Sequence, residues 1–291
     1  MKDTKTLRVG LVGYGEVGGI FGAALAREVA LASAYDIRPT DAMRDRAERD
    51  GVRLCKSVAE AVGDADLVIS AVTASATRDA AQSIAASVRR GAHVLDINSA
   101  SPRTKIECGA LIDAAGGRYV ESAVMTSVPP YGIAVPMLLG GAHAEAIVPT
   151  LSALGFKARF ASHDIGVASA IKMCRSVMIK GMEAIVIESF LAARRYGVER
   201  EVLASLAETF PTIDWEKQGS YFWSRVVRHG KRRAEEMREA AATVREIGVD
   251  PLMASAIAGR HQWVADVAAS GVFEELTEDA AWRDFADCVP R

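Results

Sequence analysis

The sequence has few cysteines, no excess of charge of either sign and no long hydrophobic run. Its four cysteines are scattered through 291 residues, and no two of them form a CxxC pair, which argues against a disulfide framework or a zinc site. The 35 basic and 37 acidic residues leave a formal net charge of −2, so the composition gives no support for nucleic-acid binding. No stretch approaches the roughly 18 uncharged apolar residues of a membrane span.

These absences predict a protein of the reducing cytoplasm, without a metal site and without a membrane or nucleic-acid partner. The first 15 residues (MKDTKTLRVGLVGYG) reach a glycine before a long apolar region forms, which is not typical of a signal peptide. Hydrophobic residues make up 50% of the chain, enough for a sizeable core. The length favours two domains of roughly 150 residues each.

Short apolar runs alternate with helical patterns in the first half of the chain. The runs predict strands at 7–13, 28–36, 66–72, 92–98 and 117–125. The segments between them predict helices at 17–27, 39–51, 57–63, 78–88 and 103–116. Alternation of this kind implies right-handed crossovers and a parallel, doubly wound α/β sheet.

Only helical periodicity is visible in the second half. A long helix is predicted from Ile165 to about Tyr196, where Gly197 supplies a stop. Further helical segments are predicted at 201–210, 219–248 and 251–269. We therefore expect a nucleotide-binding domain at 1–163 and an all-helical domain at 164–291.

A glycine-rich loop lies at the first strand–helix junction. It consists of Gly13, Tyr14, Gly15, Glu16, Val17 and Gly18. In such a loop the first glycine makes a tight turn, the second lets a pyrophosphate approach the backbone, and the third lets helix and strand pack closely. A plain glycine turn is the alternative, but the position within a strand–helix–strand pattern favours dinucleotide binding.

The end of the next predicted strand bears on the choice between NAD and NADP. Asp36 follows Gly18 by eighteen residues, close to the spacing of about 20 expected for a carboxylate that binds the ribose hydroxyls. Such a carboxylate repels a 2′-phosphate and favours NAD. Arg38 could instead pair with that phosphate in NADP, or could be a solvated surface charge.

Four motifs together carry a closer resemblance. They are LVGYGEVG at 11–18, DINSASP at 96–102, ESAVMTS at 121–127, and Gly166, Lys172 and Ser176 within the long helical segment. In this order they resemble the β-hydroxyacid dehydrogenase family, which includes 3-hydroxyisobutyrate and 6-phosphogluconate dehydrogenases. The resemblance implies a Rossmann domain followed by an all-α domain entered through a long interdomain helix, with NAD or NADP as cofactor. It also implies a homodimer formed through the helical domain.

By resemblance, the second motif contacts substrate beside the nicotinamide. Asn98 and Ser99 are its matching polar residues, and either could make that contact; Asn98 and Thr73 are also expected beside the cofactor. A helix N-terminal turn ahead of Pro102 is the alternative reading of the motif.

The third motif departs from the family pattern. Where the family has a serine and two glycines that bind a substrate carboxylate, this chain has Met125, Thr126 and Ser127, and the thioether of Met125 cannot donate a hydrogen bond. Either Thr126 and Ser127, with Ser122 nearby, replace those contacts, or the substrate is not a small β-hydroxy carboxylate.

The stretch IKMCRSVMIKG (171–181) places Lys172 in an apolar helix. A surface lysine whose stem covers apolar neighbours is one explanation. The order of motifs favours another, in which Lys172 is a general acid/base whose pKa is lowered by partial burial. Ser176 lies one turn further on the same face and replaces the family's asparagine.

The family's second substrate-binding lysine has no equivalent in this chain. Glu235 and Glu236 occupy its motif, and basic residues around it could supply the charge or form a solvated face, namely His229, Lys231, Arg232 and Arg233. An aromatic cluster at Trp215, Tyr221, Phe222 and Trp223 is expected to pack in the core, with a larger, apolar substrate pocket as the alternative.

Taken together, the sequence predicts an NAD(P)-dependent oxidoreductase that interconverts an alcohol and its carbonyl compound. The substrate is expected to be a small molecule, a β-hydroxy acid or a bulkier, more apolar relative. An aldehyde, ketone or imine reductase is the alternative within enzymes. A non-catalytic dinucleotide-binding regulator is the alternative outside them.

Overall fold

The computed structural model describes residues 4–290 and divides into two compact units, Met1–Lys172 and Met173–Arg291. The predicted domain boundary at 163/164 lies just before the helix α7 (Val167–Tyr196), whose first residues belong to the first unit. Within the described residues, no helix is both long enough and apolar enough to span a membrane.

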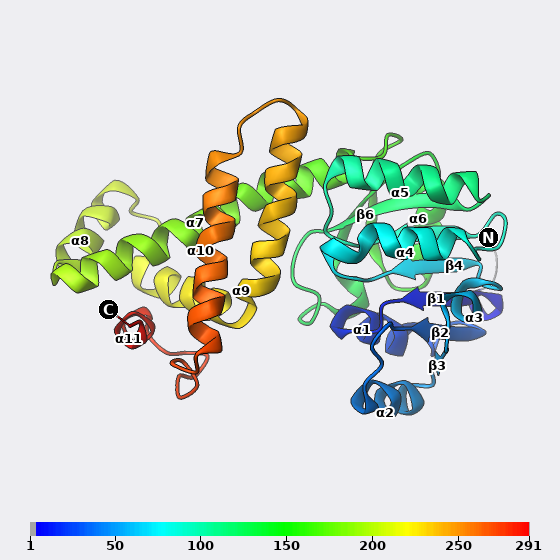
Figure 1. Cartoon of the computed structure of the whole chain (residues 1–291), viewed down its shortest axis with the longest axis horizontal. Helices are drawn as coiled ribbons and strands as arrows, with labels where there is room; N and C mark the ends of the chain where they lie inside the picture. Colours follow the sequence, from blue (N-terminus) through cyan, green and yellow to red (C-terminus); the bar gives the residue numbers. More distant parts are fainter. Residues whose placement is uncertain (1–3, 291) are drawn as a thin grey trace. The chain divides into compact units, whose positions relative to one another are not determined.

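The first unit is built on one eight-stranded sheet with the strand order β3-β2-β1-β4-β5-β6-β7-β8 (Figure 1). Neighbouring strands are parallel, except that β6 and β7 are antiparallel. The strands are β1 (Arg8–Val12), β2 (Leu31–Tyr35), β3 (Arg53–Leu54), β4 (Leu67–Ser70), β5 (His93–Asp96), β6 (Arg118–Val124), β7 (Pro136–Gly140) and β8 (Lys157–Ser162). The predicted doubly wound α/β class is confirmed.

Helices cover both faces of this sheet because its strands alternate their apolar side chains. One face packs on α1 (Glu16–Leu25), α2 (Asp41–Asp50) and α6 (Ala144–Ala153). The other packs on α3 (Val58–Val62), α4 (Thr77–Ala85) and α5 (Pro102–Ala114). Three short 3₁₀ turns complete the unit: η1 (Thr4–Thr6), η2 (Ala74–Ala76) and η3 (Gly132–Ala134). Strands β1 to β6 all run in one direction, so their carboxyl ends share one edge of the sheet, where ligands of such sheets bind.

Several predicted boundaries were wrong, and some elements were missed. The strand predicted from residue 28 begins at Leu31, because residues 26–30 form a turn closed by hydrogen bonds to the carbonyl of Leu25. Strands β3, β7 and β8 and helix α6 were not predicted. β3 has only two residues, β7 begins with a proline, and α6 contains Pro149, so their patterns are weak in the sequence.

Up to residue 290, the last that the structure describes, the second unit contains helices and no strand. It comprises the rest of α7 with α8 (Glu199–Thr209), α9 (Trp215–Glu246), α10 (Leu252–Ala269) and α11 (Trp282–Cys288). The long helix predicted from Ile165 to Tyr196 is confirmed within two residues, and Gly197 follows it with a φ of +70°. α9 and α10 lie side by side (Figure 1). The core reading of the aromatic cluster is confirmed for Trp215, Phe222 and Trp223, whereas Tyr221 is 49% exposed.

Candidate active site

The three glycines of the glycine loop have different roles. Gly13 has a φ of +93°, and a Cβ on it would lie 2.3 Å from the carbonyl oxygen of Ala71. A Cβ on Gly18 would lie 2.1 Å from the oxygen of Gly13. A Cβ on Gly15 would meet no atom within 4 Å. Gly13 and Gly18 are thus needed for packing, while Gly15 leaves open space at the N-terminus of α1, where a phosphate group fits.

Asp36 follows β2 and is tied to this loop. Its Oδ2 accepts a hydrogen bond from the backbone N–H of Tyr14 at 2.8 Å, and its Oδ1 accepts one from the N–H of Arg38 at 2.9 Å. A carboxylate can accept further hydrogen bonds, so Asp36 both orients the loop and retains capacity for ribose hydroxyls. The Arg38 side chain is exposed.

Arg46 of α2 is a further contact of the loop that sequence reasoning missed. Its Nη2 donates to the carbonyl oxygens of Tyr14 and Gly15, and its Cζ lies 4.8 Å from the centroid of the Tyr14 ring. Burial raises the pKa of Tyr14, an effect that Arg46 partly offsets. A Cβ on Gly19 would lie 2.5 Å from Arg46 Cζ, so the sequence signal was the second glycine of the Gly18–Gly19 pair.

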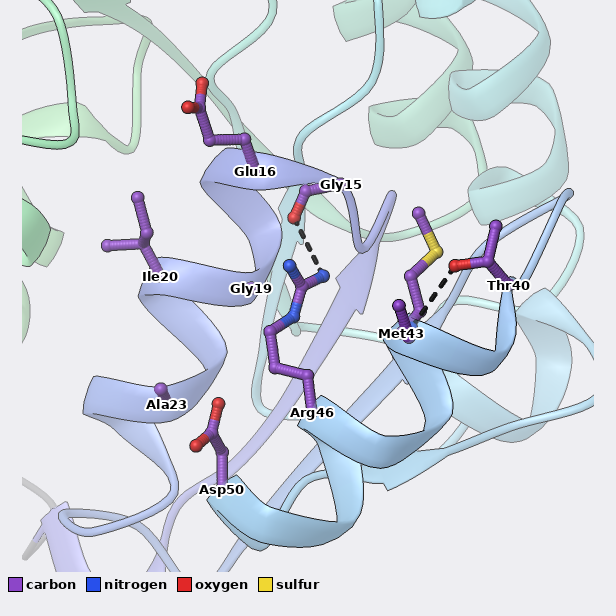
Figure 2. A pocket seen from close by; sticks show the side chains of 10 residues that line it. Gly15, Glu16, Gly19, Ile20, Ala23, Thr40, Met43, Arg46 and Asp50 are labelled. Carbon is purple, nitrogen blue, oxygen red and sulfur yellow. Dashed lines mark hydrogen bonds between the residues drawn. The ribbon is translucent and has the colours of Figure 1, made fainter.

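A cavity of about 530 Å³ lies between α1 and α2 beside this loop (Figure 2). Its walls are Gly15, Glu16, Gly19, Ile20, Ala23, Thr40, Ala42, Met43, Arg46 and Asp50. The guanidinium of Arg46 crosses it toward Gly15, while Thr40 caps α2 by accepting the N–H of Met43 at 3.2 Å. The volume is within the range of small-molecule sites, and the cavity has charged groups of both signs.

The loop after β5 is held by a buried carboxylate, Asp96. Its Oδ1 accepts the N–H of Asn98 at 2.9 Å and lies 2.8 Å from Nζ of the buried Lys105. Its Oδ2 accepts the hydroxyl of Tyr119 at 2.8 Å. Burial, together with the neighbouring Asp96, raises the pKa of Tyr119 well above its ordinary value, so this hydroxyl remains a donor. The start of the loop is therefore fixed.

Asn98 and Ser99 are neighbours in this loop but differ in their burial and in their hydrogen bonds. The Oδ1 of Asn98 accepts the N–H of Val72 at 2.7 Å, and its Nδ2 donates to Ser70 at 2.9 Å. Asn98 therefore ties the loop after β5 to Ser70 at the end of β4 and to Val72, which directly precedes Thr73, the other residue expected beside the cofactor. The side chain of Ser99 is instead half-buried.

Lys172 reaches Ser99 from α7. Its Nζ donates to Ser99 Oγ at 2.6 Å, across 73 residues of sequence, and the lysine is half-buried. Both residues belong to the first unit. Two side chains singled out from separate motifs are thus in direct contact.

Ser176 has a different partner in the second unit. Lys180 Nζ donates to Ser176 Oγ at 3.2 Å and forms an ion pair with Glu236 at 2.9 Å. Lys180 was not singled out in the sequence, although it lies one turn beyond Ser176. Its buried ammonium therefore contacts Glu236, which lies in the motif where the family has its second substrate-binding lysine.

A second buried ion pair lies deeper in the helical unit. Arg233 donates through two nitrogens to the carboxylate of Glu183, and both side chains are buried. His261 Nε2 lies 3.6 Å from Glu183. Since that carboxylate already pairs with Arg233, and burial lowers the pKa of His261 to about 3, the imidazole is neutral. Arg233 is thus a structural residue, not a source of free charge.

Comparison with known proteins places this geometry in a family. The model for the NAD binding domain of 6-phosphogluconate dehydrogenase matches residues 8–155, just over half of the chain. The chain belongs to the β-hydroxyacid dehydrogenase family. A nicotinamide dinucleotide is accordingly its cofactor. In the helical unit, a domain of unknown function (DUF1932) matches residues 193–264.

Two relatives of this chain have solved structures and are described without an assigned activity. A conserved hypothetical protein from Sinorhizobium meliloti is 36% identical, covering 99% of this chain and 97% of that one, with a TM-score of 0.78. A conserved protein of unknown function, described as structurally similar to 3-hydroxyacid dehydrogenases, is 31% identical over 91% of this chain and 98% of its own, with a TM-score of 0.70.

More distant structures share the fold alone. A Mycobacterium tuberculosis 3-hydroxyisobutyrate dehydrogenase with L-serine is 17% identical, covering 98% of this chain and 100% of that one, with a TM-score of 0.69. An Aspergillus terreus reductive aminase in complex with NADPH and ethyl levulinate is 18% identical over 98% of both chains, with a TM-score of 0.58. The fold thus occurs in proteins named for alcohol and for amine chemistry.

The third family motif ends at the turn after β6. Met125 is half-buried, and its N–H bonds the carbonyl of Pro136 at 3.0 Å. Thr126 is exposed and Ser127 half-buried. Ser122 is 1% exposed and donates to Met137 Sδ at 3.4 Å, so its hydroxyl faces the interior of the sheet. The structure does not bring Ser122 together with Ser99 and Lys172.

Proposed function

We propose that this chain is an NAD(P)-dependent dehydrogenase that interconverts an alcohol and its carbonyl compound. The observation that carries the proposal is the 2.6 Å contact between Lys172 Nζ and Ser99 Oγ, just beyond the carboxyl end of β5. Ligands of doubly wound sheets bind along this edge. The open space at Gly15 is on the same unit.

The chemistry needs a proton acceptor beside the reacting hydroxyl. A bound nicotinamide supplies the hydride acceptor. Lys172 takes the hydroxyl proton during oxidation and returns it during reduction, the role of a general acid/base. Ser99 orients the same hydroxyl. Asn98 is less suited to that contact because both ends of its amide are already bonded.

The substrate we favour is a β-hydroxy acid or a related alcohol that is bulkier or more apolar. Met125 replaces a hydrogen-bonding serine of the family pattern, and a thioether favours apolar contact over a carboxylate. In the helical unit, the buried Lys180 is already paired with Glu236, which lies in the motif that carries the family's second lysine.

We favour NAD over NADP as the cofactor. Asp36 carries its negative charge at the end of β2, where a 2′-phosphate would lie. Arg38 is exposed and donates its backbone N–H to Asp36. A guanidinium can pair with a 2′-phosphate, so the side chain of Arg38 is the feature that favours NADP.

We also propose a homodimer formed through the helical unit. Met178 is 68% exposed and Ile185 is 56% exposed, one heptad apart on α7. Large exposed apolar side chains in such a stripe favour burial against a second copy. Equilibrium sedimentation should give a dimer at micromolar concentration, and a stable monomer would contradict the proposal.

The deciding experiment compares Lys172→Ala with the unmodified protein on a panel of hydroxy acids and simple alcohols, with NAD⁺ and NADP⁺ separately. Loss of the proton acceptor should lower kcat by about 10²- to 10⁴-fold and leave cofactor affinity unchanged. Lys56→Ala, which removes an exposed lysine of the same unit, is the control. Unchanged turnover in Lys172→Ala would refute the assigned role.

The same panel separates the alternatives. Each alcohol is paired with its amine analogue, so turnover of amines alone would move the assignment to imine reduction. Tight nucleotide binding without turnover of any compound would favour a regulator.

A further inference from the structure

A buried carboxylate on β6 holds the N-terminus of α7. Glu121 is 0% exposed. Its Oε1 accepts the backbone N–H groups of Gly166 and Ala168 at 2.8 and 2.9 Å. Its Oε2 accepts the hydroxyl of Ser169 at 2.9 Å. Three donors from one helix terminus thus converge on a side chain 45 to 48 residues away.

The residue directly before α7 has no side chain with which to cap the helix. The first N–H groups of a helix have no intrahelical acceptor, and residues just before a helix usually supply one. Here the preceding residue is Gly166, with a φ of +104° and no side chain. A negative charge at this end also interacts favourably with the helix dipole. Glu121 therefore acts as a distant N-terminal cap.

The neighbouring strand is shaped to admit the glutamate. Gly140 of β7 is the register partner of Glu121. A Cβ on Gly140 would lie 2.3 Å from Glu121 Oε1. Because Gly140 has no side chain, the carboxylate of Glu121 has room to extend to the N-terminus of α7.

The capped turn is the one directly before Lys172. Ala168 and Lys172 are four residues apart, so the backbone N–H of Lys172 bonds the carbonyl of Ala168 in the regular helix. A helix that is fixed at its first turn fixes the direction of the Lys172 side chain. On the other side of the contact, Asp96 fixes the loop of Ser99, and Asp96 is the register partner of Glu121 across β5 and β6.

We propose that Glu121 is a positioning residue for Lys172, which places the lysine Nζ against Ser99 by capping the first turn of α7. The proposal rests on the proposed role of Lys172 in proton transfer. It does not require Glu121 to touch substrate or cofactor.

A labelling experiment tests the geometry without any substrate. Acetic anhydride modifies free amines, and mass spectrometry follows each lysine separately. In Glu121→Ala, Lys172 should label at least about tenfold faster relative to the exposed Lys56 and Lys217, the effect of losing about one cap. The buried Lys105 should stay protected, which shows that the fold is intact.

Two further variants separate positioning from general damage. Glu121→Gln keeps a carbonyl oxygen for both backbone N–H groups and should restore most of the protection of Lys172. Ser169→Ala removes the Oε2 contact, together with the contact of the same hydroxyl with the carbonyl of Gly166 at 3.1 Å, and leaves both backbone N–H contacts of Glu121 in place. It should give a small increase in labelling, measurable even if Glu121→Ala does not fold. The proposal would be overturned if Lys172 were labelled at the same rate in the unmodified protein and in all three variants.

Turnover supplies a separate readout once the panel above has identified a substrate. Glu121→Ala should lower kcat by about 100-fold, the effect of a misplaced catalytic group, while KM for the nucleotide changes less than twofold. Faster Lys172 labelling with unchanged kcat would mean that the cap exists but that Lys172 is not catalytic, so the proposed role of Lys172 fails while the capping role of Glu121 stands. Lower kcat with unchanged labelling would refute the positioning role.

Discussion

Replacing Gly15 and Gly18 separately by alanine should dissociate cofactor binding from folding. Both glycines belong to one motif, and sequence comparison alone would treat them alike. The Cβ of Gly15→Ala enters open space, and Gly15 has a φ of −67°, which any residue can adopt. The Cβ of Gly18→Ala would lie 2.1 Å from the oxygen of Gly13, a distance that forces the backbone apart.

The expected magnitudes follow from these two distances. Overlap with a main-chain oxygen should cost about 1–3 kcal/mol of unfolding free energy in Gly18→Ala. In Gly15→Ala, the weaker N-cap preference of alanine is offset by lower entropy of the unfolded chain, so stability should change by less than about 1 kcal/mol. The new methyl group occupies the approach of the pyrophosphate and should raise the Kd at least about tenfold, or about 1.4 kcal/mol.

Nucleotide fluorescence titration with NADH and NADPH measures the affinity, and urea unfolding measures the stability. Gly259→Ala in α10, whose Cβ also meets nothing within 4 Å, is the control that should alter neither Kd nor fold integrity. Unchanged Kd for both nucleotides in Gly15→Ala would refute the reasoning, because the phosphates could not then lie against this glycine. Full stability of Gly18→Ala would show that the loop packs differently.

Two more predictions concern charge. Burial lowers the pKa of His261 from 6.5 to about 3, so between these pH values the unfolded chain binds a proton that the folded chain does not. The free energy of unfolding should therefore fall by about 2 kcal/mol from pH 8 to pH 5. In urea unfolding, His261→Phe should lack this part of the pH dependence. Asp36→Asn should lower the ratio of the Kd for NADPH to that for NADH about tenfold in fluorescence titrations, since the repelling charge is lost while an acceptor for the backbone N–H of Tyr14 remains; an unchanged ratio would mean that Asp36 does not face the ribose.

The sequence predicted those features whose signals are local. The glycine loop, the parallel sheet and the long helix each depend on residues within a few turns of one another, so their periodicity is visible in the chain. The strands β7 and β8 were missed because they form the edge of the sheet beyond the antiparallel β6–β7 pair, and β7 starts at a proline, so their pattern is weak.

The contacts that hold the candidate site could not be predicted in the same way. Arg46 reaches Gly15 across 31 residues, and Glu121 reaches Gly166 across 45. Nothing in the spacing marks either pair, because their proximity depends on how the strands are ordered in the sheet. Lys172 and Ser99 belong to separate motifs of the sequence, and only the structure places the two in contact.

The departures from the family pattern are unevenly distributed over the molecule. The groups that hold Lys172 and Ser99 in place, Glu121 and Asp96, are buried, hydrogen-bonded and register partners on adjacent strands. Met125, by contrast, is half-buried at a turn, where a change of side chain costs the fold little. The proposed proton-transfer geometry therefore depends on buried carboxylates, whereas the two departures differ in their surroundings. Met125 lies at the turn after β6, and Ser176, which replaces the family's asparagine, is buried and accepts a hydrogen bond from Lys180.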